Sequence, residues 1–513
     1  MQRLSRLRIP LKTHSETVRG FVKSAAMGDK KGSGSRVLNI DNMNPNVKVM
    51  EYAVRGPLVI RAGQIEEELQ KGTSKKLFNQ VIRANIGDCH AVGQTPLPFL
   101  RQVVAGAAYP DMLDKMNMPL DVRDRVNRIL DGCRGHSIGS YTDSVGIDNI
   151  RKDVASYISK RDGGIASNHT DIFLCGGASD GIKSILKLLM TEEPGRQAGV
   201  MIPIPQYPLY TATIAEYNAF PVPYYLDEAN KWALDVPDLE RAVKENASKC
   251  DLRAIVVINP GNPTGQVLSK QNIEDVIKFA KKNHLFILAD EVYQHNIYAK
   301  GSEFHSFKKV LNSMGPEYAG MELASFMSTS KGYMGECGFR GGYCEAVNLD
   351  PDVRAMLLKF LSAKLCPNVP GQCAIEVVVN PPKQGEPSYD LFMQDKNKVL
   401  GDLATKAKMT TQILNSIDGI TCNEVMGAMY AFPKITIPQK AIDQAKTKGM
   451  QPDAFFCFEL LEETGICVVP GSGFGQREGT FHFRTTILPP VDQIKMMLDK
   501  LKEFYAAFVH KYK

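Results

Sequence analysis

Residues 285–293 read Leu-Phe-Ile-Leu-Ala-Asp-Glu-Val-Tyr, and they are the strongest indication of the fold in the sequence. Its unbroken apolar run predicts a β-strand that is buried on both faces, as in a parallel sheet covered by helices. The run ends at Asp290, and a buried carboxylate is unfavourable unless a cation or a hydrogen-bond donor compensates it. We therefore expect a covered parallel sheet with a positively charged partner at the end of this strand.

Short apolar strands alternate with helical segments on both sides of this stretch. Such alternation predicts an α/β fold with a doubly wound, mostly parallel sheet, in which ligands bind beyond the carboxyl ends of the strands. The predicted strands are Asp171–Cys175, Val200–Ile204, Val222–Leu226, Ala254–Ile258, Leu285–Ala289, Leu323–Met327 and Gly342–Ala346. The predicted helices include Gly181–Met190, Leu209–Tyr217, Pro237–Ala247 and Lys270–Asn283.

The pattern changes after residue 375, where prolines at 381, 382 and 387 indicate a linker. A long helical stretch, 394–417, precedes short strands around 429–435, 466–469 and 480–486. This pattern predicts a smaller α+β domain. We expect a large domain over residues 96–375 and a small domain over 376–513 that is completed by residues 38–95.

The composition is that of a globular protein with more than one core, with 43% hydrophobic and 23% charged residues among 513. No apolar run is long enough to cross a bilayer. The eleven cysteines form no CxxC pair and have no zinc-ligand spacing. The sequence therefore predicts free thiols, a reducing compartment and no metal site.

Residues 1–26 form a basic leader. Six basic side chains against the single acid Glu16 give this leader a net charge of +5. The chain as a whole carries +6, so its body is close to neutral and has no nucleic-acid footprint. The composition of residues 1–26 predicts a transit peptide to the mitochondrial matrix, followed by a linker at 27–37. The alternatives are a disordered basic arm and a cytoplasmic form that starts at Met27.

A lysine follows another predicted strand, in residues 325–340, Ser-Phe-Met-Ser-Thr-Ser-Lys-Gly-Tyr-Met-Gly-Glu-Cys-Gly-Phe-Arg. Lysine can form a Schiff base with an aldehyde, and we expect partial burial to lower the pKa of Lys331 so that its free amine acts as nucleophile and base. Ser-x-x-Lys is common, however, so this motif alone does not establish the role of Lys331.

Gly176–Gly181 leads from a strand into a helix and offers backbone N–H groups to a phosphate. Ser328 and Arg340 would add a hydroxyl and a bidentate charge.

Polar side chains also follow two other predicted strands. Asn262, in Asn-Pro-Gly-Asn-Pro-Thr-Gly (259–265), could donate to a phenolate oxygen, although the segment also reads as a simple turn. A pyridinium nitrogen would explain Asp290, with Tyr293 reaching the O3′ of the ring; the alternative is a helix cap. Tyr207 could stack on the ring or belong to the core.

Arg484 lies in Phe-His-Phe-Arg-Thr-Thr (481–486), which alternates like a half-buried strand. Arginine is rarely buried without an anionic partner. A substrate α-carboxylate and a structural salt bridge are the two candidates.

In this order the motifs resemble those of the class I/II aminotransferases, which have the fold of the type I pyridoxal-phosphate enzymes. Longer stretches resemble a narrower group, the alanine aminotransferases. These stretches are 85–88, 203–210, 328–338 and 469–479, and the resemblance extends from about residue 38 to the end.

The resemblance implies a role for each candidate residue. Lys331 would hold pyridoxal 5'-phosphate as an internal aldimine, and the catalytic residues would be Lys331, Asp290 and Tyr293. The cofactor-binding residues would be Ala178, Ser179, Tyr207, Asn262, Asp290, Tyr293, Ser328, Lys331, Arg340 and, reaching into the neighbouring subunit, Tyr141. Those that bind the substrate would be Gly87, Asn262 and Arg484.

The implied reaction is reversible ping-pong amino transfer from L-alanine to 2-oxoglutarate, giving pyruvate and L-glutamate, by a homodimer with shared active sites. Tyr207 stands where aspartate-specific members carry a tryptophan, and their second substrate arginine has no counterpart that we can locate. The alternative is another enzyme of the same fold, with a different amino donor or β-lyase activity. A nicotinamide oxidoreductase would need a phosphate fingerprint that the sequence lacks. A DNA-binding regulator would need an added module that the leader is too short to form.

Overall fold

The computed structural model describes residues 38–52, 56–193 and 195–513. The predictions for the leader at 1–26 and the linker at 27–37 lie outside these residues.

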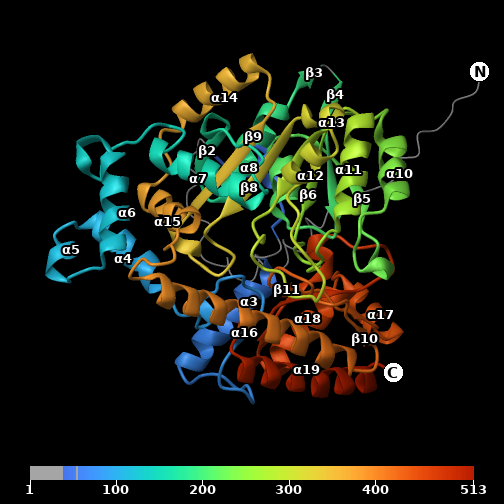
Figure 1. Cartoon of the computed structure of the whole chain (residues 1–513). Helices are drawn as coiled ribbons and strands as arrows, with labels where there is room; N and C mark the ends of the chain where they lie inside the picture. The colour runs from blue at the N-terminus through green and yellow to red at the C-terminus, as the bar shows by residue number, and fades with distance from the viewer. Residues whose placement is uncertain (1–37, 53–55, 194) are drawn as a thin grey trace, which may run out of the picture.

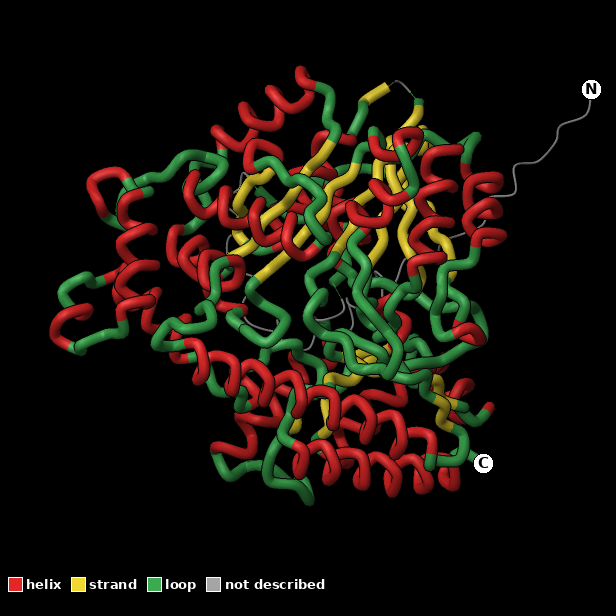
Figure 2. The backbone as a smooth tube through the Cα atoms, viewed as in Figure 1, coloured by secondary structure: helices red, strands yellow, loops and turns green. Residues whose placement is uncertain are grey.

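A mixed, mostly parallel sheet forms the centre of the molecule (Figures 1 and 2). Its strand order is β2-β9-β8-β7-β6-β4-β3, and β5 also pairs with β4. The pairs β4–β5, β4–β6, β6–β7 and β7–β8 are parallel, whereas β9 is antiparallel to both β2 and β8. The strands are β2 Ile172–Gly176, β3 Glu192–Glu193, β4 Arg196–Ile204, β5 Phe220–Tyr225, β6 Cys250–Ile258, β7 Phe286–Asp290, β8 Leu323–Ser328 and β9 Gly341–Val347. The predicted α/β fold class is therefore confirmed.

Both faces of the sheet are buried, as the unbroken apolar runs predict. On β6, Val256 enters one hydrophobic core and Val257 enters another on the opposite face. The first core contains α8 and α9, and the second contains α10, α11 and α12. The helices of this part are α7 Asp148–Arg161, α8 Ala178–Leu189, α9 Leu209–Glu216, α10 Val236–Asn246, α11 Lys270–Lys282, α12 Phe307–Ser313, α13 Pro316–Ala319, α14 Pro351–Ala363 and α15 Val369–Val379.

The chain before β2 is mainly helical. Helix α15 packs against α4, α7 and β9, so these helices extend the large layer on one side. The early elements are α2 Pro45–Lys48, α3 Pro57–Gln70, β1 Ile82–Arg83, α4 Pro98–Ala108, α5 Met112–Lys115 and α6 Leu120–Asp131.

The C-terminal residues form a second layer below the sheet in Figure 1, and α3 lies within it. Strand β1 pairs with β13, and α3 contacts α18. The elements are α16 Tyr389–Asn415, β10 Ile420–Thr421, β11 Tyr430–Ala431, β12 Lys434–Ile435, α17 Gln439–Thr447, α18 Pro452–Thr464, β13 Ile466–Cys467, β14 Val469–Pro470, β15 Phe483–Thr486 and α19 Val491–Lys511. These contacts support the predicted partition at 38–95, 96–375 and 376–513, which remains a prediction.

The prediction of a half-buried strand around Arg484 is wrong. All residues of β15 are buried. Strand β15 is the middle strand of the order β11-β15-β14, and Phe483 stacks on Phe456 of α18. The alternating residues of β15 therefore face two different parts of the interior, one apolar and one polar.

Candidate active site

Four segments that follow strands of the large sheet carry the predicted site residues. Ser179 follows β2, Asn262 follows β6, Asp290 ends β7 and Lys331 follows β8. Because β6, β7 and β8 are parallel neighbours, their carboxyl ends lie at one edge of the sheet. The C-terminal layer adds Arg484 from β15.

Asp290 is a buried carboxylate with one satisfied oxygen. Its Oδ2 accepts a hydrogen bond of 2.9 Å from the hydroxyl of Tyr210, whereas its Oδ1 is buried without a partner in the described structure. Burial raises the pKa of Asp290 to about 6, although the Tyr210 hydroxyl, the Val292 backbone N–H and the charge of Lys331 oppose this shift. Turns follow Asp290 instead of a helix, so the helix-cap alternative is wrong. An unpartnered buried oxygen of this kind fits a cationic or N–H donor that approaches from the site.

The amine of Lys331 points at the segment that contains Gly87. Its Nζ donates a hydrogen bond of 3.0 Å to the Gly87 carbonyl oxygen. Desolvation is the largest single influence and lowers the pKa of Lys331, but Tyr430, Cys337 and Cys89 together raise it above its ordinary value. The predicted lowering of the Lys331 pKa is therefore wrong, because the interactions with the Tyr430 phenol and the two thiols outweigh the effect of burial.

Arg484 is 1% exposed and forms no ion pair with an acidic residue in the part of the chain that the structure describes. Its Nη1 donates to Asn262 Oδ1 at 3.0 Å, its Nη2 donates to the Asn85 carbonyl oxygen at 2.8 Å, and its Nε has no partner there. The structural salt bridge is thus ruled out. Asn262 in turn donates from Nδ2 to the Tyr293 hydroxyl at 3.4 Å, so one polar chain joins Arg484 to Tyr293.

The start of α8 has the form of an anion site. Gly177 at the N-cap has a φ of 82° and no side-chain cap, which leaves N–H groups of the first turn free to bind an anion. Arg340 Nη2 lies 3.3 Å from the Gly176 carbonyl oxygen, and a side chain at position 177 would come within 2.5 Å of this guanidinium. Ser328 Oγ accepts a hydrogen bond from the Ser330 amide at 3.1 Å. Ala178 and Ser179 are the first two residues of α8 and directly follow Gly177.

Tyr207 and Tyr141 differ in their positions. Tyr207 is half-buried, its hydroxyl lies 2.6 Å from that of Tyr52, and burial raises its pKa well above the ordinary value. Tyr141 is 68% exposed, and the structure records no contact between it and the residues above. One chain therefore brings together all predicted site residues except Tyr141.

The profile of the family "Aminotransferase class I and II" matches residues 108–501. The chain belongs to this family. It is 60% identical over 478 residues to "Alanine aminotransferase 2-like" of Danio rerio, and the aligned region covers 93% of this chain and 87% of that protein. It is 45% identical to "Probable alanine aminotransferase, mitochondrial" of Dictyostelium discoideum, and the aligned region covers 94% of this chain and 92% of that protein. The solved "Alanine aminotransferase from Pyrococcus furiosus" superposes with a TM-score of 0.69 at 25% identity, with 90% of this chain and 98% of that chain covered.

Aminotransferases of this class use pyridoxal 5'-phosphate, and the residues present fit it. The unpartnered Asp290 Oδ1 suits a pyridinium N–H, the amine of Lys331 suits an aldehyde, and the free N–H groups at α8 suit a phosphate.

No group of three or more His, Cys, Asp or Glu side chains within the described ranges could hold a metal ion. Within the same ranges, no helix combines the length and apolarity that a bilayer crossing requires. All eleven cysteines are free thiols.

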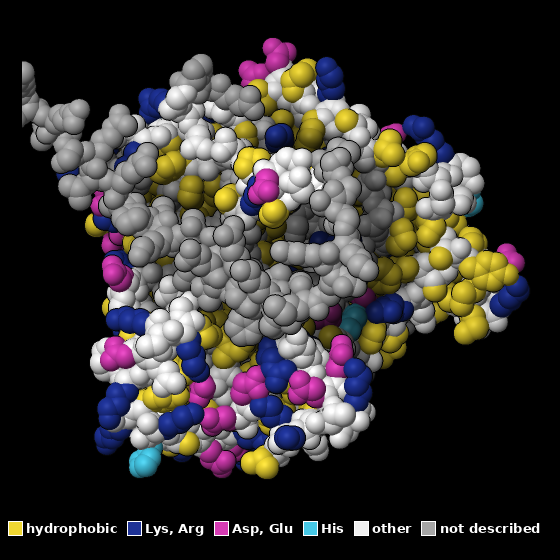
Figure 3. Space-filling model, turned by 180° about the vertical axis from the view of Figure 1, so that it is seen from behind, with side chains coloured by type: hydrophobic (Ala, Val, Ile, Leu, Met, Phe, Trp, Pro, Cys, Tyr) yellow, Lys and Arg dark blue, Asp and Glu magenta, His cyan; other side chains and the backbone are white. Residues whose placement is uncertain are grey.

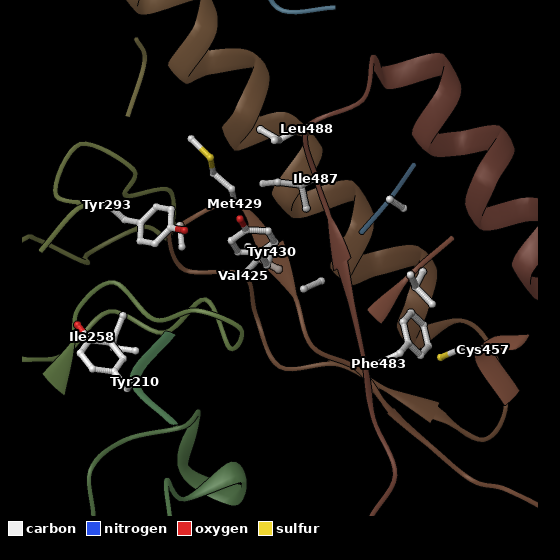
Figure 4. Packing of buried hydrophobic residues seen from close by; sticks show 14 of the residues in the cluster. Tyr210, Ile258, Tyr293, Val425, Met429, Tyr430, Cys457, Phe483, Ile487 and Leu488 are labelled. Atoms are coloured by element: carbon white, nitrogen blue, oxygen red, sulfur yellow. The ribbon is translucent and has the colours of Figure 1, made fainter. Parts of the chain in front are cut away.

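Sequence reasoning missed two tyrosines of this aminotransferase site. Tyr210 binds Asp290, and Tyr430 of β11 lies against Tyr293 with 6.2 Å between ring centroids. Figure 4 shows the side chain of Tyr293 pointing toward Tyr430. Both missed residues lie in apolar surroundings, where the sequence pattern indicates only a core aromatic residue. The one available signal for Tyr210 was its place in the motif Pro-Ile-Pro-Gln-Tyr-Pro-Leu-Tyr (203–210).

Proposed function

We propose that this aminotransferase transfers an amino group reversibly from L-alanine to 2-oxoglutarate, giving pyruvate and L-glutamate. The printed names of the relatives, at 60% and 45% identity over most of the chain, support alanine as the donor. The observation that carries the proposal is the pair formed by the half-buried Lys331 and the buried Arg484. A reactive amine and an unpaired guanidinium lie on either side of Gly87 and Tyr430.

When bound, pyridoxal phosphate supplies an aldehyde that receives the amino group and a ring that withdraws electrons. Asp290 would hold a proton at the ring nitrogen, and Asn262 and Tyr293 would donate to the ring oxygen. The first turn of α8, with Ser179, would hold the phosphate together with Ser328 and Arg340, and Tyr207 would stack on the ring. The places of these residues after strands that end at one edge of the sheet support these roles.

The substrate is bound by its charge and limited by the space around Gly87. Arg484 would take the α-carboxylate of alanine or glutamate in its planar fork, because this guanidinium is buried with its Nε unpartnered. A Cβ atom at position 87 would lie 3.1 Å from Lys331 Nζ, so only glycine leaves room for a substrate beside the amine. Lys331 would then take the proton from the α-carbon and return it, acting as base and acid.

The visible absorption of the purified holoenzyme tests this proposal. We expect L-alanine alone to bleach the band of the bound cofactor, with one pyruvate released per site. A band that does not respond to alanine would overturn the donor, and screening other amino acids and β-elimination substrates would then identify the alternative enzyme. Lys331→Ala should lose turnover while its thermal unfolding stays cooperative; a variant that kept a near wild-type kcat would refute the role of Lys331.

We also propose a homodimer in which Tyr141 completes the phosphate site of the partner. The support is the exposure of Tyr141 and of hydrophobic side chains on α4–α6, where Tyr109, Met116 and Leu120 are 50–65% exposed. Figure 3 shows hydrophobic side chains gathered on this projecting part. Mixing Lys331→Ala with Tyr141→Ala subunits tests the arrangement, since a heterodimer regains one complete site. Activity that never exceeds the sum of the separate variants would contradict it.

The proposed location is the mitochondrial matrix. The basic composition of residues 1–26 supports it, and so does the word "mitochondrial" in the name of the Dictyostelium relative. A fluorescent fusion of the full chain should colocalise with mitochondria, and a form starting at Met27 should stay in the cytoplasm. Equal distribution of the two forms would contradict the assignment.

A further inference from the structure

Tyr430 occupies the space between the two charged residues of the site. Its ring lies beneath Arg484, with 4.1 Å between the guanidinium carbon and the ring centroid, and it meets Tyr293 edge to face at an interplanar angle of 85°. Tyr430 itself is 3% exposed. An arginine over an aromatic face is held by the quadrupole of the ring, so these contacts fix the orientation of the Tyr430 ring.

The hydroxyl of Tyr430 and the amine of Lys331 both lie close to Gly87. A Cβ atom placed on Gly87 would lie 1.9 Å from Tyr430 Oη and 3.1 Å from Lys331 Nζ. Because both atoms are this close to one point, they are at most about 5 Å apart. The backbone fixes the phenol at this place, since Tyr430 pairs with Thr486 on β15, two residues beyond Arg484.

We propose that Tyr430 is a positioning residue for Lys331. The phenol oxygen of Tyr430 serves as the counter-group that holds the lysine amine at Gly87. The inference rests on the proposed role of Lys331 and deepens it. A proton can then pass from the Lys331 ammonium to the Tyr430 phenolate, which yields a free amine and a neutral phenol without loss of a proton from the site. This exchange offers a route to the free amine that the reaction requires.

The electrostatics of the pair agree with the geometry. Burial acts to raise the pKa of Tyr430. The positive charges of Lys331 and Arg484, together with a hydrogen bond to Tyr293, bring this pKa below its ordinary value. Tyr430 is correspondingly the strongest influence that raises the pKa of Lys331. The other titratable groups that face the amine are Cys89 from the segment after Gly87, Cys337 from its own segment, Asp290 from β7, Tyr293 from the loop after β7 and Arg484 from β15.

Tyr430→Phe removes the hydroxyl and keeps the ring under Arg484. The first measurement is the pH dependence of Lys331 acetylation by acetic anhydride in the cofactor-free protein, followed by mass spectrometry. Without the phenol, desolvation and Arg484 act on the amine with less opposition, so its pKa should fall and its labelling near pH 8 should become severalfold faster. Tyr505→Phe is the matched control, because Tyr505 is also a buried tyrosine and bonds the Gly419 and Thr436 carbonyls instead.

The second measurement is the pH profile of kcat/KM for alanine in the reconstituted enzyme, whose acid limb should move to lower pH in Tyr430→Phe. Labelling of Lys331 that is unchanged in a cooperatively folded Tyr430→Phe protein would overturn the inference. The labelling needs no cofactor or substrate. A failure of the alanine assignment therefore shows in the absorption test of the holoenzyme and leaves the labelling result intact.

Discussion

Replacement of Arg484 by lysine separates the charge of this residue from its shape. The guanidinium spans two partners, since Nη1 bonds Asn262 and Nη2 bonds the Asn85 carbonyl oxygen at the same time. A lysine keeps the positive charge, but a single ammonium cannot present two parallel N–H groups to a carboxylate. Arg484→Lys therefore removes the fork and leaves the electrostatic attraction.

The size of the effect follows from the burial of Arg484, which is 1% exposed. Truncating one partner of a buried, hydrogen-bonded charge pair costs about 2–5 kcal/mol. Because lysine retains the charge, we expect the lower part of this range, about 2–3 kcal/mol. At about 1.4 kcal/mol per factor of ten, this corresponds to a loss on the order of 30- to 150-fold in kcat/KM. Alanine and glutamate should lose equally, since both present an α-carboxylate.

The assay compares kcat/KM for alanine, glutamate and ethylamine, which is alanine without its carboxylate. The wild-type enzyme should prefer alanine strongly over ethylamine, and Arg484→Lys should reduce this preference with little change for ethylamine. Arg477→Lys is the matched control, because Arg477 also lies over an aromatic ring, that of Tyr225, but is exposed. An equal loss for ethylamine would refute carboxylate binding and assign Arg484 a structural role.

Two further predictions concern Asp290 and Gly87. Burial raises the pKa of Asp290 to about 6, so the folded protein holds this proton more tightly than the unfolded chain, and the resulting stability is lost as the pH rises through about 6. At pH 7.5 the cofactor-free Asp290→Asn protein should therefore be more stable than wild type, by on the order of 2 kcal/mol in the free energy of unfolding, and should melt at a higher temperature. The same variant should retain less pyridoxal phosphate on dialysis. Equal melting temperatures at pH 7.5 and pH 5 in both proteins would contradict this. Gly87→Ala places a Cβ 1.9 Å from Tyr430 Oη, so kcat should fall at least tenfold, whereas Gly401→Ala, with no atom within 4 Å of its Cβ, should leave kcat unchanged.

Residues that follow predicted strands could be placed from the sequence. The apolar runs that end at Ile258, Ala289 and Met327 fix the carboxyl ends of β6, β7 and β8 to within a residue or so. Because parallel neighbours end at one edge, the polar residues just beyond those ends had to meet. Local pattern and sheet geometry therefore sufficed for Asn262 and Lys331.

The environment of Lys331 could not be predicted in the same way. The direction of its pKa shift depends on Tyr430, a residue about a hundred positions away in a short strand of the other layer. The sequence around Arg484 misled for a related reason. His482 looks like an exposed residue of an alternating strand, but it is buried, stacks on Phe432 at 4.9 Å and lies 3.1 Å from Glu228. Its apparent polarity is satisfied inside the protein, and no local pattern distinguishes this from exposure.

The spacing between Arg484 and Lys331, the proposed carboxylate-binding and reacting residues, depends on backbone hydrogen bonds between the two layers. The Gly427 amide donates to the Gly265 carbonyl oxygen at 2.8 Å, and the Ala428 amide donates to that of Asn296 at 3.1 Å. These bonds tie the segment before β11 to the turn that carries Asn262 and to the loop that follows Tyr293. Since β11 pairs with β15, Arg484 is held to the same backbone as Asn262. A substrate carboxylate bound by Arg484, as proposed above, would thereby be held at a fixed distance from the Lys331 amine, as positional catalysis requires.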